Sequence, residues 1–341
     1  MGGSGLTAAR RLAERGADVV VLDAVGIAAG AAGRNGGFLL AGGARFHHEA
    51  VTTWGHELAV GLYRATLDEL DRTLDELGDL ASRTGSVRIA ASEDEERDIE
   101  RQRRALVTDG FAVEPYDGPE GRGLLVPDDA VFQPVARCRL LARAAVAAGA
   151  RLHAPARVTG LGDGTVTTSA GDVRADRTLV AVDGGLEQLL PELADDVGTA
   201  RLQMLATAPD PDLSLPRPVY RRWGYEYVQQ LATGEVLLGG CRDRFAADEW
   251  DAPAVPSDEV QSCLDAELAR LGVAAPVTHR WAAHAAFTQD ALPVCREVRH
   301  GVLVVGAYSG HGNLVGTLAA RVAADTALDG GDLTLDRLVA P

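Results

Sequence analysis

The sequence predicts an α/β protein in which an antiparallel, hairpin-rich region is inserted into a domain built on a parallel sheet. Buried strand-like runs alternate with Ala/Leu/Arg-rich helical segments near both ends of the chain, and short strands with turn residues fill the middle. The chain has 341 residues, which is enough for two joined domains. Hydrophobic residues make up 46% and charged residues 24%, as in ordinary globular proteins.

The chain opens with glycines and a serine that lead directly into a helical segment. Leu6, Ala9, Leu12 and Ala13 have helical spacing, and Gly16 ends the segment. The run DVVVLD at 18–23 then has the composition of a buried strand that closes on an acidic residue. A second glycine-rich stretch follows, and it contains GAAGRNGG.

The remaining elements are predicted from periodicity and turn residues. SVRIAAS, the runs between 156 and 182, YRRWGYEYVQQL, GEVLLGG and GVLVVGA have strand patterns. The helical patterns cover residues 54–84, 93–107, about 134–149, 257–272 and about 313–328.

Composition excludes several classes of function. The net charge is −16, from 33 basic and 49 acidic residues, and such a surface repels nucleic acid. The sequence contains no lysine, so all basic residues other than histidine are arginines. A Schiff-base mechanism, a P-loop and a protein-kinase site therefore lack their required side chain.

The four cysteines are widely scattered, at Cys138, Cys241, Cys263 and Cys295. They form no CxxC pair and no cluster with zinc spacing, so we expect reduced, mostly buried thiols and no metal site. No apolar run approaches the ~18 residues of a membrane helix, and no signal peptide opens the chain. We therefore expect a soluble, cytoplasmic protein without a membrane span.

The opening segment matches part of a Rossmann dinucleotide-binding fingerprint. That fingerprint consists of a strand, a GxGxxG turn, a helix and then an acidic residue for the ribose. The helix is present, and Asp23 stands at the acidic position. If Gly5 is the third glycine, Gly2 is the second, and the first glycine and first strand fall before Met1. We expect that strand to be missing and the natural chain to begin about ten residues upstream; the alternative is a helix that merely follows a flexible N-terminus.

Four stretches of the sequence, in order, carry a family resemblance: GGSGLTAARRLAERG with VVVLDA, GRNGG at 33–37, GDVRADRTLVAVDG at 171–184, and AAFTQDALPV with GVLVVGAYSGHGN at 285–313. With them the chain resembles the D-amino-acid oxidase, glycine oxidase and sarcosine oxidase superfamily of FAD-dependent oxidoreductases. Within it, the chain looks most similar to gamma-glutamylputrescine oxidase and related amine oxidases. The resemblance covers essentially the full length and implies a Rossmann-like FAD-binding domain with an inserted antiparallel substrate domain.

The resemblance assigns these regions to the two domains. Residues 1–50, 127–205 and 285–341 would form the FAD-binding domain, and residues 51–126 and 206–284 the substrate domain. The implied cofactor contacts are Gly2, Gly3, Ser4, Gly5, Asp23, Ala24, Ala32, Gly33, Arg34, Asn35, Gly36, Gly37, Val158, Ala181, Val182, Asp183, Gly306, Ser309, Gly310, His311, Gly312 and Asn313.

FAD is expected to be held non-covalently. Some sarcosine oxidases attach it to a cysteine in the last region, and the matching position here is Ala285. Those enzymes also activate oxygen with a lysine, which this chain lacks, so either another positive group replaces it or the electron acceptor is not oxygen.

The proposed catalytic residues are His311, Tyr225 and Tyr227. His311 would support negative charge on the reduced flavin together with the helix that follows it; the alternative is a turn residue. Alternation would place Tyr225 and Tyr227 on one face of a strand, facing substrate or packed in the sheet. The pairs His47–His48 and Arg221–Arg222 are expected to lie at the surface. No catalytic base is evident, and in this family the amine is often simply bound unprotonated.

Three functions remain open at this stage. The first is oxidation of a small amine or amino acid with oxygen as acceptor, giving hydrogen peroxide. The second is a dehydrogenase that passes its electrons to a quinone or carrier. The third is a flavin-holding or apo protein without turnover.

Overall fold

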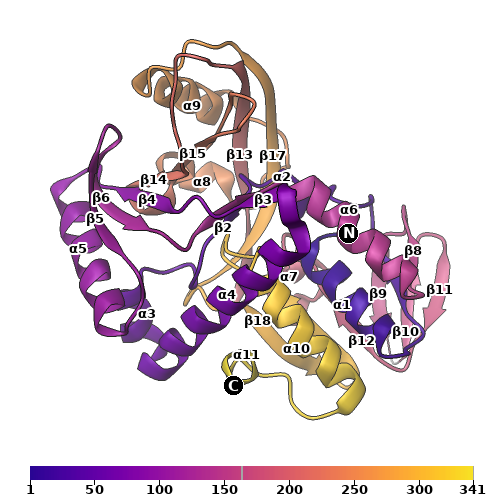
Figure 1. The fold of residues 1–341 in the computed structure, drawn as a ribbon. Helices are drawn as coiled ribbons and strands as arrows, with labels where there is room; N and C mark the ends of the chain where they lie inside the picture. Colours follow the sequence, from indigo (N-terminus) through magenta and orange to yellow (C-terminus); the bar gives the residue numbers. More distant parts are fainter. Residues whose placement is uncertain (163, 341) are drawn as a thin grey trace.

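The computed structural model describes residues 1–162 and 164–340 (Figure 1). Its helices are α1 (Gly3–Glu14), α2 (Ala31–Arg34), α3 (His47–Trp54), α4 (His56–Leu77), α5 (Glu93–Thr108), α6 (Pro134–Ala147), α7 (Leu186–Leu189), α8 (Ala246–Glu249), α9 (Asp258–Arg270), α10 (Val315–Asp329) and α11 (Asp336–Val339). Short 3-10 turns cover Gly78–Leu80, Pro191–Leu193, Arg222–Gly224 and Arg242–Phe245.

The strands are β1 (Val20–Leu22), β2 (Phe38–Leu39), β3 (Ala81–Ser82), β4 (Ser86–Ile89), β5 (Glu114–Gly118), β6 (Gly121–Val126), β7 (Ala130–Phe132), β8 (Arg151–His153), β9 (Val158–Gly162) and β10 (Thr165–Thr168). They continue with β11 (Gly171–Arg174), β12 (Thr178–Val180), β13 (Val197–Pro209), β14 (Val219–Arg221), β15 (Glu226–Gln230), β16 (Glu235–Gly240), β17 (Val277–Thr288), β18 (Val294–Arg299) and β19 (Val302–Gly306).

Parallel pairing occurs near both ends of the chain, as predicted. Strand β1 pairs in parallel with β8, and β12 pairs in parallel with β19, which β18 extends in antiparallel fashion. Helix α1 packs against α6 and α10, and its buried alanines Ala8 and Ala9 allow close approach. Among the described residues, no strand joins the β1–β8 sheet to the β12–β19–β18 sheet.

The inserted region forms a sheet of eight strands in the order β17-β13-β16-β15-β14-β4-β6-β5. All of its pairings are antiparallel except the one between β14 and β4. Helix α9 contributes Val260 and Leu264 to the core beneath this sheet, where they meet Leu205 and Leu238. The predicted fold class, an α/β protein with an inserted antiparallel sheet, is confirmed.

Two features differ in detail from the sequence expectations. The helical pattern over 54–84 is divided, because α4 ends at Leu77 before Gly78, whose φ is +50°, and strand β3 follows at Ala81. The proposed domain boundaries at 205 and 285 lie inside β13 and β17, two long strands that pair side by side. The division into domains remains a prediction, and its last residue, 341, lies outside the described part.

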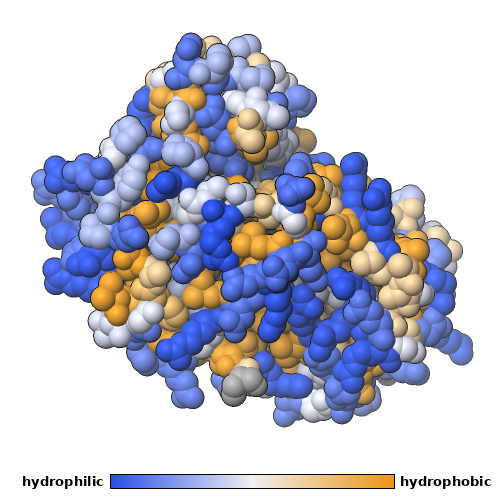
Figure 2. All heavy atoms as spheres, viewed as in Figure 1, coloured by the Kyte–Doolittle hydropathy of each residue, from blue (hydrophilic) through white to orange (hydrophobic). Residues whose placement is uncertain are grey.

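The surface agrees with the composition. Hydrophilic residues cover most of the face drawn in Figure 2, as expected for a chain with 49 acidic and 33 basic residues. Among the described residues, no helix combines the length and the apolarity that crossing a bilayer would require.

Candidate functional site

A large cavity of about 1080 Å³ lies where the two parts of the molecule meet. Its wall is built from the start of α1, the loop around α2, strands β13 and β17, the segment that contains β14 and β15, and the turn between β19 and α10. These segments are far apart in sequence. The fold therefore collects most of the glycine-rich motifs around one space.

The start of α1 lines one end of this cavity through Gly2, Gly3 and Ser4. No side chain caps the helix, so amide groups of its first turn remain available to a ligand. The backbone is also crowded here: a Cβ on Gly2 would lie 3.0 Å from Cβ of Ala32, and one on Gly33 would lie 2.1 Å from the carbonyl oxygen of Ala28. Only glycine permits this approach, and the free amides favour an anion.

Asp23 lies at the same end and is already engaged within the chain. Its Oδ1 accepts hydrogen bonds from the amides of Val25 (2.9 Å) and Gly26 (2.7 Å), and its Oδ2 pairs with the N-terminal ammonium of Met1. The predicted role of Asp23 with a ribose therefore stays a prediction, and a ribose hydroxyl would share these oxygens.

The GRNGG loop is held mainly by its own polar side chains. Arg34 Nη1 donates to the carbonyl oxygen of Ala282 (3.0 Å), so it braces the loop against β17. Asn35 Nδ2 donates to the carbonyl oxygens of Ala31 and Ala32, and Asn35 Oδ1 accepts from the amide of Gly37. The side chains expected to contact the cofactor thus also position the loop backbone.

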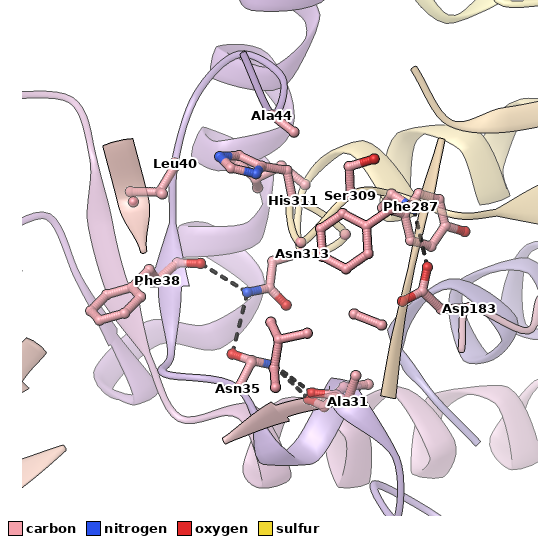
Figure 3. Close-up of a pocket in the computed structure, with 18 of the residues that line it drawn as sticks. Ala31, Asn35, Phe38, Leu40, Ala44, Asp183, Phe287, Ser309, His311 and Asn313 are labelled. Carbon is pink, nitrogen blue, oxygen red and sulfur yellow. Dashed lines mark hydrogen bonds between the residues drawn. The ribbon is translucent and has the colours of Figure 1, made fainter. Parts of the chain in front are cut away.

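The turn between β19 and α10 forms another part of the wall (Figure 3). Ala307 and Ser309 have φ values of +53° and +50°, a region that non-glycine residues rarely occupy. The turn is held by the amide of Tyr308, which donates to Asp183 Oδ1 (3.1 Å), and by the amide of Ser309, which donates to the carbonyl oxygen of Ala286 (3.0 Å). Such strain persists only where neighbouring contacts fix the backbone.

Asp183 therefore supports this turn. Its Oδ2 also accepts from the amide of Ala286 (3.3 Å) on β17. Burial raises the pKa of Asp183 to about 6, against the effect of its backbone donors. Residues Ala181 and Val182 beside it line the cavity.

Asn313 and His311 project from the same turn. Asn313 Nδ2 donates to the carbonyl oxygen of Phe38 (2.9 Å) and to Asn35 Oδ1 (3.3 Å), so it joins this turn to the GRNGG loop (Figure 3). His311 Nδ1 is buried and has no hydrogen-bond partner among the described residues. Burial, aided by the charge of Arg88, lowers the pKa of His311 to about 4. The imidazole is therefore neutral at pH 7 and can donate a hydrogen bond from one nitrogen.

The predicted pair Tyr225 and Tyr227 both line the cavity, although not by strand alternation. Strand β15 begins at Glu226, and Tyr225 precedes it in a turn that follows Trp223 with φ of +54°. Tyr227 packs at 6.1 Å against Tyr220, and Tyr225 is 38% exposed. The expectation of one shared strand face was wrong, because a 3-10 turn interrupts the strand.

Arg242 is a cavity residue that the sequence alone did not single out. Its guanidinium lies over the rings of Phe287 (4.6 Å), Trp250 (5.3 Å) and Tyr225 (5.5 Å). In the described part of the chain, no carboxylate lies within salt-bridge distance of it. Arg242 is thus a cation in an aromatic setting, available to an anionic group.

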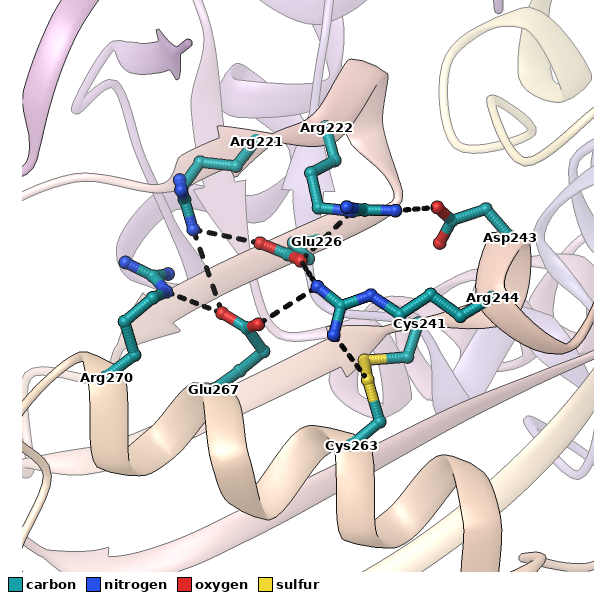
Figure 4. The surroundings of a disulfide bond; sticks show 9 residues. All are labelled: Arg221, Arg222, Glu226, Cys241, Asp243, Arg244, Cys263, Glu267 and Arg270. Carbon is teal, nitrogen blue, oxygen red and sulfur yellow. Dashed lines mark hydrogen bonds and ion pairs between the residues drawn. A yellow bond between two sulfur atoms is a disulfide. The ribbon is translucent and has the colours of Figure 1, made fainter. Parts of the chain in front are cut away.

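Cys241, the neighbour of Arg242, forms a disulfide with Cys263 on α9 (Figure 4). The expectation of reduced thiols was wrong for this pair, because the fold brings two cysteines 22 residues apart to a Cα–Cα distance of 6.4 Å. Cys138 and Cys295 are free and buried.

Ion pairs surround the disulfide. Glu226 pairs with Arg221 (3.1 Å) and Arg244 (2.8 Å), and Glu267 pairs with Arg270 (2.6 Å). Arg221 and Arg222, expected at the surface, are partly buried members of this network.

The other pair expected at the surface is also partly internal. His47 is only 3% exposed, and its Nε2 lies 2.6 Å from Asp109 Oδ2. Ligating atoms of His48, Glu49 and Asp98 lie within 4.8 Å of one another. However, Asp98 already accepts hydrogen bonds from Trp223 (2.7 Å) and Arg101 (2.6 Å), so this group has an internal explanation without a metal.

Most of the predicted cofactor residues reach the cavity wall, and some do not. Those outside the wall are Gly5, Ala24, Gly33, Gly37, Val158 and Gly306. For Val158, the preceding Arg157 lines the cavity instead. Sequence reasoning also missed Arg88, Arg137 and Arg242, because nothing in a chain with so many arginines distinguishes them.

The arrangement fits FAD. The start of α1 offers free helix amides and glycines to a diphosphate, and the turn before α10 presents a buried imidazole nitrogen that has no partner among the described residues. A cavity that has an anion-binding helix start and a separate polar group in its wall suits a dinucleotide that carries an electron-accepting ring.

Comparison with known proteins agrees with this assignment. Residues 1–326 match the DAO family model, described as FAD dependent oxidoreductase. The chain is 28% identical to the probable oxidoreductase OrdL of Rhizobium meliloti (strain 1021), over 99% of this chain and 83% of that protein.

Two solved structures share its fold. One is glycine oxidase from Bacillus cereus ATCC 14579, with a TM-score of 0.78, 19% identity and 98% of each chain covered. The other is L-proline dehydrogenase from P. horikoshii, with a TM-score of 0.76, 18% identity, and 96% of this chain and 92% of that chain covered. Together with the match over residues 1–326, the geometry leads to one conclusion: the chain belongs to the DAO family of FAD-dependent oxidoreductases.

Proposed function

We propose that the protein holds FAD non-covalently and oxidises the carbon–nitrogen bond of a small amino acid or of an amine that carries an acidic group. The observation that supports this most is the presence, in one cavity, of a neutral His311 with a buried Nδ1 and of the Arg242 guanidinium, which has no carboxylate within salt-bridge distance in the described part of the chain. His311 suits a reduced flavin, and Arg242 suits the acidic group of a substrate.

The flavin supplies a hydride acceptor for the carbon next to the amine nitrogen. The substrate loses that hydride and a nitrogen-bound proton, and the resulting imine takes up water to give a carbonyl compound and an amine or ammonia. The α10 terminus and His311 would favour negative charge on the flavin side of the cavity.

The rest of the wall would orient the substrate. Arg242 is positioned to bind a carboxylate, and the rings of Tyr225 and Phe287 beside it would pack on apolar parts of the substrate. Ala285 lies on β17 where sarcosine oxidases with covalent flavin have cysteine, so a thiol is lacking there.

Two acceptors would complete the reaction cycle. With oxygen, the two electrons and two protons give hydrogen peroxide, as in the oxidases that the chain resembles. A carrier or quinone is the second candidate, and it is motivated by the absence of lysine from the whole sequence.

The test uses the protein reconstituted with FAD and a panel of amino acids and matched amines. Anaerobic bleaching of the flavin identifies substrates, and peroxide formation in air identifies the acceptor. Bleaching with peroxide supports the oxidase, whereas bleaching with slow peroxide formation and fast reduction of a quinone supports the dehydrogenase. Firm FAD binding without bleaching by any member of the panel would argue against turnover of these substrates.

A further inference from the structure

Arg137 is a buried cation in the wall of the cavity. It projects from α6, its residue is only 4% exposed, and it lines the same end of the cavity as Gly2 and Gly3. Its hydrogen-bond partners are neutral: Nη1 donates to the carbonyl oxygen of Asn313 (2.9 Å) and Nη2 to Thr317 Oγ1 (2.6 Å). The guanidinium also lies 5.6 Å from the ring centre of Phe132.

Arg137 has no direct counter-ion among the described residues, because the acidic residues that act on it from further away, Glu69 and Glu76, pair with Arg321 and Arg10. No carboxylate in the described part of the chain lies within salt-bridge distance of Arg137. The helices α1 and α10 both begin nearby, and each presents the positive end of its dipole. Burial lowers the pKa of Arg137, because removing the guanidinium from water disfavours its charged form. Buried charges are ordinarily paired, so this arrangement favours an anion in the adjoining cavity.

We propose that Arg137 is the counter-ion for the diphosphate of FAD. This inference rests on the proposed FAD binding and extends it to a residue that no motif marks. A Cβ placed on Gly3 would lie 3.7 Å from Nη1 of Arg137, so the guanidinium stands directly beside the backbone that approaches the diphosphate. A guanidinium can also donate two parallel hydrogen bonds to phosphate oxygens, which an ammonium cannot do.

The competing role is purely structural, since Arg137 also ties α6 to the start of α10. The two roles differ in the cofactor-free protein. If Arg137 binds the diphosphate, its buried charge destabilises the cofactor-free protein, and replacing Arg137 leaves the apo protein equally stable or more stable. If Arg137 only holds α6 against the start of α10, replacing it lowers the stability of the apo protein and of the FAD-bound protein alike.

The experiment compares Arg137→Gln, Arg137→Lys and the control Arg45→Gln. Arg45 lines the same cavity but donates to the carbonyl oxygens of Gln289 (2.9 Å) and Asp290 (3.0 Å). Flavin fluorescence gives the Kd of FAD, competition by ADP tests the diphosphate without the flavin, and thermal melting gives the Tm of each apo protein.

We expect Arg137→Gln to weaken FAD and ADP at least tenfold, Arg137→Lys to weaken them less, and Arg45→Gln to leave them unchanged. The apo Tm of Arg137→Gln should equal or exceed that of the unmodified protein. A Kd within twofold of the original, or parallel losses of apo Tm and FAD affinity, would overturn the proposal. Tight FAD binding without substrate turnover would contradict the proposed oxidation and leave this inference standing, whereas an unmodified protein that binds neither FAD nor ADP would end both.

Discussion

At the scale of single residues, hydrogen-bond partners distinguish the arginines of the cavity. Six arginines line it, and within the described residues only Arg88 has a carboxylate within salt-bridge distance, at 3.5 Å from Asp129 Oδ2. Arg34 and Arg45 donate to carbonyl oxygens and so serve the loops. Arg242 faces aromatic rings alone, which leaves its donors to a ligand.

We predict that Arg242→Gln raises KM for amino acid substrates and changes kcat little. Loss of a charge-assisted hydrogen bond costs roughly 1.5–3 kcal/mol, which corresponds to about ten- to 150-fold in KM. The matched amine without a carboxylate should be oxidised equally by both proteins. Arg280→Gln serves as the control, because Arg280 pairs with Asp265 (2.8 Å) on the exposed side of β17. Equal losses for the amino acid and the amine would contradict a contact with the carboxylate.

His311 makes the stability of the apo protein depend on pH. Its pKa is about 4 when folded and 6.5 ordinarily, so the unfolded chain binds a proton that the folded protein resists. The contribution of neutral His311 is therefore full above pH 6.5 and is lost as pH falls through 4. At most about 3 kcal/mol is involved, from 1.36 kcal/mol per pKa unit.

Urea unfolding of the apo protein and of His311→Gln between pH 7 and pH 4 checks this. The unmodified protein should lose more stability than the variant over that window. Identical pH profiles for the two proteins would show that His311 is protonated as freely when folded as when unfolded.

The site residues that the sequence predicts stand in recognisable motifs, and the site residues that it misses do not. Gly2, Gly3 and Asn313 stand in motifs with a fixed order, so their chemistry could be predicted. Arg137 and Arg242 become visible only in the structure, where each guanidinium lies in the cavity wall over an aromatic ring, which is a property of three-dimensional packing.

At the scale of elements, the turn from Gly306 to Asn313 depends on supports from two other segments. Asp183 follows β12 and binds both the turn and β17, and Asn313 returns a contact to the GRNGG loop. The sequence predicted the strand, the glycine turn and the helix that follows it. The positive φ values of Ala307 and Ser309 could not be predicted, because neither residue favours them intrinsically.

The segment after β16 is a second element whose conformation is fixed by tertiary contacts. Cys241 has a φ of +62°, and the disulfide to Cys263 holds it against α9. Arg244 Nη1 lies 3.2 Å from Cys263 Sγ, and its Nη2 bridges Glu226 and Glu267. The scattered positions of the cysteines gave no indication of this pairing.

Reduction of the disulfide should lower the stability of the protein by about 3 kcal/mol, because the bond closes a loop of 22 residues and restricts the unfolded chain. Urea unfolding with and without a reductant measures this change. The double variant Cys241→Ala/Cys263→Ala should show no response to the reductant. A mass spectrum with four alkylated thiols before reduction would contradict the pairing.

At the scale of the whole molecule, the cavity exists because segments from both ends and the middle of the chain converge. The sequence predicted which segments carry glycine motifs, and the order of those motifs indicated the family. It could not predict that Arg242 and Tyr225, which lie in turns beside strands of the large sheet, line the same cavity as His311. That convergence depends on the long pairing of β13 with β17, which carries the eight-stranded sheet alongside the cofactor end.

A ligand that fills this cavity should therefore stabilise the molecule as one unit. At a free FAD concentration 100 times the Kd, binding to the folded state alone adds about 2.7 kcal/mol. The melting temperature should rise with FAD concentration, and unfolding should remain a single transition. The reason is that FAD would contact both the large sheet and the loops that adjoin the parallel strand pairs.

Release of the flavin by acid then tests how it is held. The two free thiols are poor nucleophiles, since burial raises the pKa of Cys138 and raises that of Cys295 to about 12, and Ala285 offers no thiol on β17. We predict that acid precipitation of FAD-loaded protein leaves all yellow colour in the supernatant, and that the redissolved pellet lacks flavin fluorescence. Flavin retained in the pellet after washing would instead show a covalent bond between flavin and protein. Cys138 lines the cavity and Cys295 does not, so Cys138→Ala would then be the first variant to examine.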